Sequence, residues 1–256
     1  MKAKSCAALI WLLILAAPIR PQEKEPACEP SVLALPLFPA SLVRPGIPLS
    51  RALEEVGSSV RNGYALFGLE VRSSDGQPPI VSLNLQPGCN LGDALRQIID
   101  QVPGYKFKVV SEHMINIYPV RAENDSQDVL KTLVPEFNAV NVDPGRIFTR
   151  PEDCISELAA RLTPKRTDPP QPSGVLGGGV LEGIGPKVTL HLNNVTVREI
   201  LNAVSEAMEQ FPPKYSPDGW IYTFQPDSNS PAGGKHSWSF LFCAPRTWKE
   251  AAPGPG

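Results

Sequence analysis

The cysteines are the residues of this chain whose spacing says most about chemistry. Cys6 lies in an apolar N-terminal stretch, whereas Cys28, Cys89, Cys154 and Cys243 are spread over the rest of the 256 residues. Zinc sites usually have paired ligands a few residues apart, so this spacing argues against zinc. We therefore expect disulfides in an oxidising compartment, with buried free thiols as the alternative. Sequence alone does not fix the pairing. If cysteines that are neighbours in the sequence pair, Cys28 with Cys89 and Cys154 with Cys243, each half of the chain contains one disulfide.

The histidines do not form a recognisable metal site or catalytic site. His113, His191 and His236 have no second ligand at metal-binding spacing, so we expect each to be a surface residue. A nucleophile built from Cys243 and His236 would need an activated thiolate and a group that orients the imidazole. Nothing in the local sequence supplies either, so we expect no catalytic residues and no metal.

The glycine run Gly177–Gly179 does not have the signature of a phosphate-binding loop. Such a loop needs lysine followed by serine or threonine at the start of a helix, whereas Lys187 precedes Val188 in an expected strand. We therefore expect no cofactor and no small-molecule substrate.

Asp93 and Glu199 have a structural interpretation because each stands at the start of an expected helix. A negative charge there interacts favourably with the positive helix end, typically by about 0.3–1 kcal/mol. This role explains both carboxylates without acid–base catalysis, and we expect that the chain is not an enzyme.

These two helices belong to a stretch that occurs twice. Each copy has an alternating strand, a capped amphipathic helix and a later apolar strand: Ser82–Leu85, Asn90–Leu95 and Ile115–Tyr118, then Thr189–Leu192, Thr196–Leu201 and Ile221–Phe224. Matched residues are 106 or 107 positions apart, as in Leu95 and Leu201 or Leu85 and Leu192. Upstream, Phe137–Gly145 resembles Phe38–Gly46 at an interval of 99. The pattern indicates two tandem repeats.

Periodicity and turn residues predict the individual elements. The helices are expected over Ser50–Val60, Asn90–Val102, Glu152–Leu162 and Val195–Gln210, and the strands over Tyr64–Val71, Ile80–Leu85, Tyr105–Val109, Met114–Val120, Val188–Leu192 and Trp220–Phe224. The predicted fold class is α+β, with two tandem small two-layer domains. Each is expected to hold a short mixed sheet and two helices in βαβ-type repeats.

Composition predicts the domain boundaries. The first repeat domain is expected over 32–121, a polar linker over 122–128, and the second repeat domain over 129–226, which includes a Gly/Pro-rich loop at 163–187. Residues 227–256 form a C-terminal tail, in which Trp238–Cys243 is either an extra strand or an aromatic contact for a partner. We expect residues 129–226 to fold by themselves.

The N-terminus is typical of an export signal. Basic residues in Met1–Lys4 precede the apolar stretch Cys6–Ala17, and Pro18 ends it. A membrane-spanning helix usually needs about 20 apolar residues, so residues 1–22 are predicted to be a cleaved signal peptide, with an uncleaved anchor as the alternative. The formal net charge of −2 gives no basis for nucleic-acid binding.

The repeated unit resembles the short N-terminal domain shared by secretins and TonB-dependent receptors. The residues that carry this resemblance are Ile47–Leu53, Val81–Leu85, Leu91–Leu95, Tyr105–Phe107 and Ile115–Ile117, with Val188–Leu201 in the second copy. The resemblance implies a periplasmic, non-enzymatic protein. It also implies contact with other envelope proteins, signalling to membrane regulators or assembly of secretin rings.

The function expected from this resemblance is an exported, non-enzymatic protein-binding or assembly module of the periplasm or cell envelope. Its partner would be an envelope or outer-membrane protein. The alternatives are a signalling module that acts on a membrane anti-sigma regulator, and a secreted hydrolase or thiol enzyme. We expect binding at a sheet edge, because edges offer backbone groups for strand addition, and the candidate segments are Leu33–Val43, Met114–Val120 and Ile221–Phe224.

The disulfide prediction can be tested on the mature protein. If Cys28, Cys89, Cys154 and Cys243 pair, alkylation under denaturing, non-reducing conditions should leave the intact mass unchanged. Labelling of all four thiols would contradict the prediction.

Overall fold

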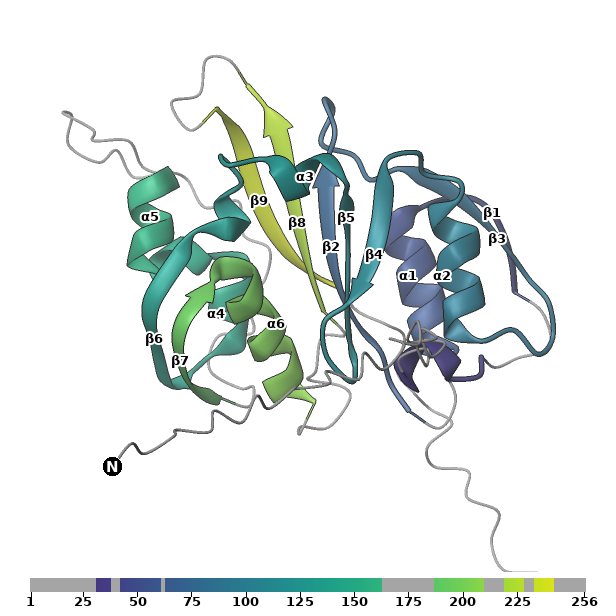
Figure 1. Cartoon of the computed structure of the whole chain (residues 1–256), viewed down its shortest axis with the longest axis horizontal. Helices are drawn as coiled ribbons and strands as arrows, with labels where there is room; N and C mark the ends of the chain where they lie inside the picture. The colour runs from purple at the N-terminus through teal and green to yellow at the C-terminus, as the bar shows by residue number, and fades with distance from the viewer. Residues whose placement is uncertain are drawn as a thin grey trace, which may run out of the picture.

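Five strands from both halves of the chain form the central sheet (Figure 1). The computed structural model describes residues 31–37, 42–60, 63–162, 187–209, 219–227 and 233–241. The order in the sheet is β4-β5-β2-β8-β9. These strands are β4 (Tyr105–Val109), β5 (Met114–Pro119), β2 (Leu66–Arg72), β8 (Gly219–Pro226) and β9 (Gly234–Leu241). The predicted α+β class is confirmed, and the aromatic segment of the tail contributes the strand β9.

Strand β2 connects the two halves. It pairs in parallel with β5 of the first half on one side and with β8 of the second half on the other. All its residues are buried because both faces of the sheet are covered. Phe67, Leu69 and Val71 face one hydrophobic core, whereas Leu66 faces the other. This sharing of one strand argues against independent folding of residues 129–226.

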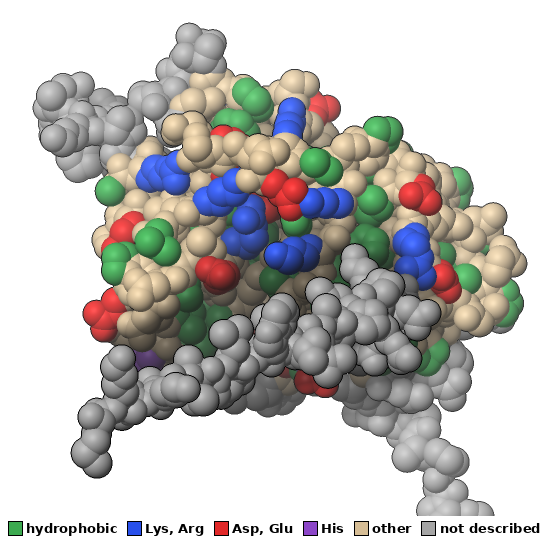
Figure 2. Space-filling model, in the orientation of Figure 1, with side chains coloured by type: hydrophobic (Ala, Val, Ile, Leu, Met, Phe, Trp, Pro, Cys, Tyr) green, Lys and Arg blue, Asp and Glu red, His purple; other side chains and the backbone are tan. Residues whose placement is uncertain are grey.

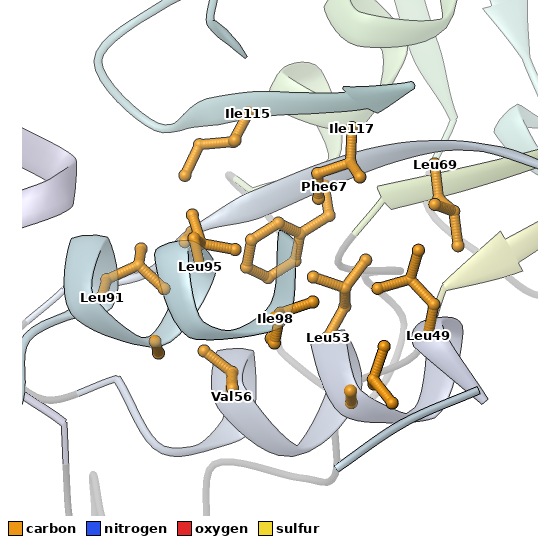
Figure 3. Close-up of a cluster of buried hydrophobic side chains, with 14 of the residues drawn as sticks. Leu49, Leu53, Val56, Phe67, Leu69, Leu91, Leu95, Ile98, Ile115 and Ile117 are labelled. Atoms are coloured by element: carbon orange, nitrogen blue, oxygen red, sulfur yellow. The ribbon is translucent and has the colours of Figure 1, made fainter. Parts of the chain in front are cut away.

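The first half supplies the layers on one face of the sheet. Helices α1 (Leu49–Ser58) and α2 (Leu91–Ile99) contact the sheet and are backed by an antiparallel pair, β1 (Leu42–Pro48) and β3 (Ile80–Leu85). Figure 3 shows how Leu53 and Ile98 from the two helices point towards Phe67 of β2. Apolar residues at helical spacing therefore form this core, as the sequence predicted.

The second half covers the opposite face with a comparable arrangement. Its antiparallel pair is β6 (Leu133–Val142) and β7 (Val188–Thr196), and its helices are α4 (Pro144–Thr149), α5 (Ser156–Leu162) and α6 (Val197–Met208). Helix α6 contacts β7, β8 and β2, and α4 contacts β9. Short helical turns lie at Ser31–Ala34 (η1), Arg121–Asn124 (α3), Val129–Lys131 (η2) and Pro151–Asp153 (η3).

The strand pairs β1–β3 and β6–β7 have the same register and the same bulge. Gly46 in β1 has a φ of +60°, and its N–H donates to Ser82 Oγ at 3.1 Å. Asn141 in β6 has a φ of +54°, and its N–H donates to Thr189 Oγ1 at 3.1 Å. Glycine and asparagine are the residues that most readily adopt this left-handed conformation. The structure therefore repeats this unit in detail.

The bulges correct the upstream alignment of the repeats. Asn141 minus Gly46 is 95, whereas the sequence comparison matched Gly145 with Gly46 at an interval of 99. The Pro-Gly dipeptides suggested the wrong match, because in the second half Pro144 and Gly145 begin helix α4. The bulge position is set by backbone conformation, which asparagine satisfies as well as glycine.

The two repeated helices begin with capping boxes, in which Asp93 and Glu199, expected near the helix starts for their charge, also accept backbone hydrogen bonds. Asn90 accepts a hydrogen bond from the Asp93 backbone N–H, and the Asp93 side chain accepts one from the Asn90 N–H. Thr196 and Glu199 make the same reciprocal pair at the start of α6. Each box satisfies backbone donors that a helix leaves unbonded.

Other predicted elements differ in position. Of the strand expected within Leu33–Val43, the described residues form the turn η1, isolated bridges at Pro36 and Leu37, and the start of β1 at Leu42. The helix expected from Glu152 is divided into η3 and α5. The signal segment, the 163–187 loop apart from Lys187, Cys28 and Cys243 lie outside the described residues.

Two glycines allow β2 and β8 to lie close together. A Cβ atom at Gly219 would lie 1.8 Å from the backbone oxygen of Phe67, and one at Gly68 would lie 2.4 Å from Trp220 Cζ2. The indole of Trp220 therefore lies across β2 at Gly68. Its Nε1 donates to Asn202 Oδ1 of α6 at 2.9 Å, so Trp220 fixes α6 on the sheet.

We expect Gly68→Ala to lower the free energy of unfolding by about 1–3 kcal/mol, because the added methyl would lie 2.4 Å from Trp220 Cζ2 and 2.5 Å from Asn116 Oδ1. Urea denaturation, followed by tryptophan fluorescence, measures this loss. In a Trp220→Leu background, which removes the clashing indole atoms and leaves only the contact with Asn116 Oδ1, the same substitution should cost less. An equal cost in both backgrounds would contradict the role assigned to Trp220.

Candidate functional site

A cluster of charged side chains is buried between β2 and α6. Arg198 of α6 donates from Nε to Glu70 Oε1 at 2.8 Å, and its Nη2 lies 3.0 Å from Asp128 Oδ2. On the other side, Arg72 Nη2 lies 3.2 Å from Glu70 Oε2 and 2.5 Å from Asp128 Oδ1. The side chains of Glu70 and Asp128 are fully buried. We call these four residues the ion cluster.

The ion cluster is stable because each buried charge has opposite charges in contact. Burial raises the pKa of Glu70, since it disfavours the carboxylate, and the cation of Arg198 opposes this effect. Burial alone would lower the pKa of Arg72, but the carboxylates of Asp128 and Glu70 outweigh burial and raise it. Asp128 also accepts a hydrogen bond from the Leu130 N–H at 3.0 Å and so caps η2. Each charged group thus faces an opposite charge, although Arg72 Nε has no hydrogen-bond partner among the described residues, and the cluster is suited to holding elements together.

Two tyrosines flank the ion cluster and connect it to the sheet edge. The guanidinium carbon of Arg72 lies 5.8 Å from the ring centre of Tyr222, and that of Arg198 lies 5.7 Å from the ring centre of Tyr118. Lys106 Nζ lies 5.5 Å from the same Tyr118 ring. Burial and a hydrogen bond to Glu123 raise the pKa of Tyr118 to about 12, so this hydroxyl stays protonated near neutral pH.

Residues 122–128, predicted to be a linker, are bound tightly to the rest of the fold. Asp125 pairs with Arg72 at 3.1 Å, and Lys131 Nζ donates to the backbone oxygens of Glu123 and Asp125. Arg161 donates to the backbone oxygen of Ser126 at 2.8 Å. The polar composition of residues 122–128 suggested a solvent-exposed linker. Their partners Arg72 and Arg161 could not be recognised, because these arginines are distant in the sequence. Figure 2 shows Lys and Arg side chains gathered near the middle of the face of the molecule that is turned towards the viewer.

Sequence reasoning did not identify the ion cluster, although two signals were present. Glu70 is a charged residue inside the otherwise apolar run Leu66–Val71. Arg198 stands 106 residues after Gly92, so the second copy has an arginine where the first has glycine. A charge in a buried strand and a cation specific to one repeat together indicate a contact between the halves.

The cysteines and histidines are not brought together as a catalytic site. Cys89 and Cys154 are free, half-buried thiols in the structure, and burial raises the pKa of Cys154, which disfavours its thiolate. The disulfides remain predictions, because Cys28 and Cys243 lie outside the described residues. His236 Nδ1 lies 2.8 Å from the Tyr222 hydroxyl.

The other two histidines also have local partners. His191 Nδ1 lies 2.8 Å from Asn138 Oδ1, and the ring of His113 lies 4.1 Å from that of Tyr64. Within the described part of the chain, no group of three or more His, Cys, Asp or Glu residues could hold a metal ion.

The outermost strands of the sheet are not those expected from the sequence. Met114–Val120 contains β5, which lies between β4 and β2, and Ile221–Phe224 belongs to β8, which lies between β2 and β9. Both segments are therefore interior, because β5 pairs with β4 and β2, and β8 pairs with β2 and β9. The outer strands are β4 and β9. On β9, Phe240 contacts Phe148 of α4 with ring centres 5.3 Å apart.

The hydrogen-bond pattern shows which backbone groups of β4 face outwards. Val110 N–H donates to the Met114 oxygen at 2.9 Å, and Val120 N–H donates to the Gly104 oxygen at 2.7 Å. Hydrogen-bonded and non-hydrogen-bonded pairs alternate along an antiparallel ladder. The N–H and C=O groups of Phe107 and Val109 therefore point away from β5. Among the described residues, no strand pairs with this side of β4.

The side chains of this edge divide between the two faces of the sheet. Tyr105, Phe107 and Val109 pack against the first core, whereas Lys106 and Lys108 lie on the other face. Lys106 forms an ion pair with Glu123, and together with Tyr118 it lowers the pKa of that carboxyl. Lys108 is exposed and forms no ion pair with any described residue. We call residues 105–110 the β4 edge.

Comparison of the chain with protein-family models, curated proteins and solved structures gave no match. The resemblance to secretin and TonB-receptor N-terminal domains therefore rests on the residues quoted for it. No described helix has the length and apolar character needed to cross a membrane.

We expect Arg198→Met to destabilise the protein by about 3–5 kcal/mol near neutral pH, because Glu70 and Asp128 lose a buried cation. Chemical denaturation measures the loss. Arg51→Met is the matched control, since Arg51 forms exposed pairs with Glu54 and Glu55, and it should cost no more than about 1 kcal/mol.

The loss in Arg198→Met should depend on pH. The pKa of Glu70 is raised in the folded state, so its contribution to stability is most favourable below the unfolded pKa of about 4.5 and falls as pH rises through the folded pKa. Without Arg198 this pKa rises further, and the loss should be smaller near pH 5 than near pH 8. A loss independent of pH would contradict the assignment.

Proposed function

We propose that this protein is an exported, non-enzymatic protein-binding or assembly module of the cell envelope, and that it binds its partner by strand addition at the β4 edge. The observation that carries the proposal is the outward orientation of the backbone groups of Phe107 and Val109. Sheet edges of this kind accept an extended segment, with backbone hydrogen bonds supplying affinity and side chains supplying specificity.

The placement of the β4 edge supports this use. Strand β4 is fixed from behind by β5, and Phe107 packs against the first core, so its backbone is held in an extended form. Binding of a partner strand would therefore cost little conformational entropy in this protein, because few of its groups become ordered. Val110, at the end of the strand, is 43% exposed and offers an apolar contact to an arriving chain.

The ion cluster supports a binding role over a catalytic one. Its carboxylates and guanidinium groups contact each other, and Glu70 and Asp128 are inaccessible to solvent. A general acid or base must reach the proton that it transfers. The cluster instead holds α6 against β2 and gives the sheet a rigid support.

A photocrosslinking residue at position 108 tests the proposal in the native cell envelope. We expect Lys108 replacement to capture a specific partner, whereas the same replacement at Lys235, an exposed lysine on the opposite outer strand, should not. Equal capture from both positions, or none from position 108, would overturn the proposal.

A second pair of variants tests the role of the backbone. Val109→Pro removes an outward N–H without removing a hydrogen bond to β5, whereas Val109→Ala keeps the N–H and loses a similar side-chain contact. Capture from position 108 should be lost only in the proline variant, with circular dichroism confirming that both variants fold. Retained capture in Val109→Pro would show that strand addition is not the mode of binding.

A further inference from the structure

We infer that the strand received at the β4 edge is an extended acidic segment in which acidic and apolar residues alternate. This inference rests on the proposed function of the β4 edge and names the chemistry of its partner. The argument comes from the positions of Lys106 and Lys108 and from the residues between and beside them.

The lysines occupy one face of the edge at the period of a strand. Lys106 and Lys108 pair with Tyr118 and Asn116 of β5, so both project to the face that carries the ion cluster. Residues directly opposite each other on neighbouring strands have Cβ atoms about 4.5–5.5 Å apart. A strand added to β4 therefore places two of its side chains, separated by one residue, opposite the two lysines. Acidic residues at these positions form favourable cross-strand pairs.

The intervening position of the partner faces an apolar surface. Phe107 lies between the lysines on the opposite face, where it packs with Tyr105 and Val109 against the first core, and all three remain half-buried. A partner residue opposite Phe107 would extend this apolar surface, which favours a β-branched or aromatic side chain there. The complementary pattern is therefore acidic–apolar–acidic.

Two copies of this chain do not fit each other at the β4 edge in the register centred on Phe107. An antiparallel pair of β4 strands related by a two-fold axis at Phe107 would place Lys106 of each copy opposite Lys108 of the other. Like charges directly opposite each other destabilise a strand pair. Lysines on edge strands commonly oppose association of this kind, and here the same charges leave an acidic strand as the complementary partner.

The charged groups around Lys106 and Lys108 have a net positive charge. Glu123 neutralises Lys106 through their ion pair, and Arg121 is exposed beside Glu123 and donates to the backbone oxygen of Arg72. Lys108 is exposed and forms no ion pair with a described carboxylate, although its charge contributes with Lys106 to the lowered pKa of Glu123. An acidic residue of the partner opposite Lys108 therefore gains a new pair without breaking one.

Synthetic peptides and the purified mature protein test the inference. The probes are a ten-residue peptide of alternating Val and Glu, the same peptide with Lys in place of Glu, and a peptide of equal composition with all Glu residues at one end. We expect only the alternating acidic peptide to shift the NMR signals of the Phe107 and Val109 amides. Its affinity should fall with added salt, since the contacts are solvent-accessible.

Variants that reverse a charge on the protein test whether the preference for acidic over basic peptides comes from Lys108. Lys108→Glu should weaken binding of the acidic peptide by about 2- to 10-fold and allow the basic peptide to bind. Lys235→Glu, which makes the same change on β9, should leave both affinities unchanged. Equal binding of acidic and basic peptides by the unaltered protein, or no binding of either, would overturn the inference.

The proposed function and this inference can fail separately. A partner captured from position 108 whose contacting strand lacks acidic residues would overturn the inference and leave the proposed function standing. Failure of capture from position 108 would overturn both. Binding of the acidic peptide together with a captured partner whose contacting strand alternates Glu or Asp with apolar residues is the result that we expect.

Discussion

The position of Glu70 between Arg72 and Arg198 is the constraint on which the rest of the structure depends. A buried carboxylate is tolerated only where cations neutralise it, and one of these cations comes from a helix 128 residues further along the chain. The ion pair therefore requires α6 to lie on β2, and this placement brings β8 into the sheet beside β2. The shared sheet and the two covering layers follow from that contact.

The two halves use one local design for different purposes. Both contain an antiparallel strand pair with the same bulge, and both begin the following helix with a capping box. In the first half, Gly92 at the start of α2 contacts Leu33 closely, so no long side chain fits there. In the second half the corresponding residue is Arg198, which completes the ion cluster. The difference between Gly92 and Arg198 at equivalent positions of the repeat thus distinguishes the half that supplies the central strand β2 from the half that packs on it.

Local features were predictable from the sequence, and pairings between distant segments were not. Alternation in Ile80–Leu85 and the carboxylates Asp93 and Glu199 identified elements and caps, because those signals depend on neighbouring residues. Met114–Val120 and Ile221–Phe224 were assigned wrongly as edges, because the parallel pairings of β2 with β5 and with β8 join strands that are distant in the sequence. The polar run 122–128 was assigned as a linker for the same reason, since its partners Arg72 and Arg161 lie far from it in the sequence.

Native-state hydrogen exchange on the full chain tests the central claim that one cooperative unit contains both halves. Amides in β5, β2, β8 and α6 should exchange through a common global opening, with the same free energy and the same dependence on denaturant. If the amides of β8 and α6 instead open at a distinctly lower free energy than those of β5 and β2, the halves fold independently. That result would contradict the role assigned to β2 and to the ion cluster.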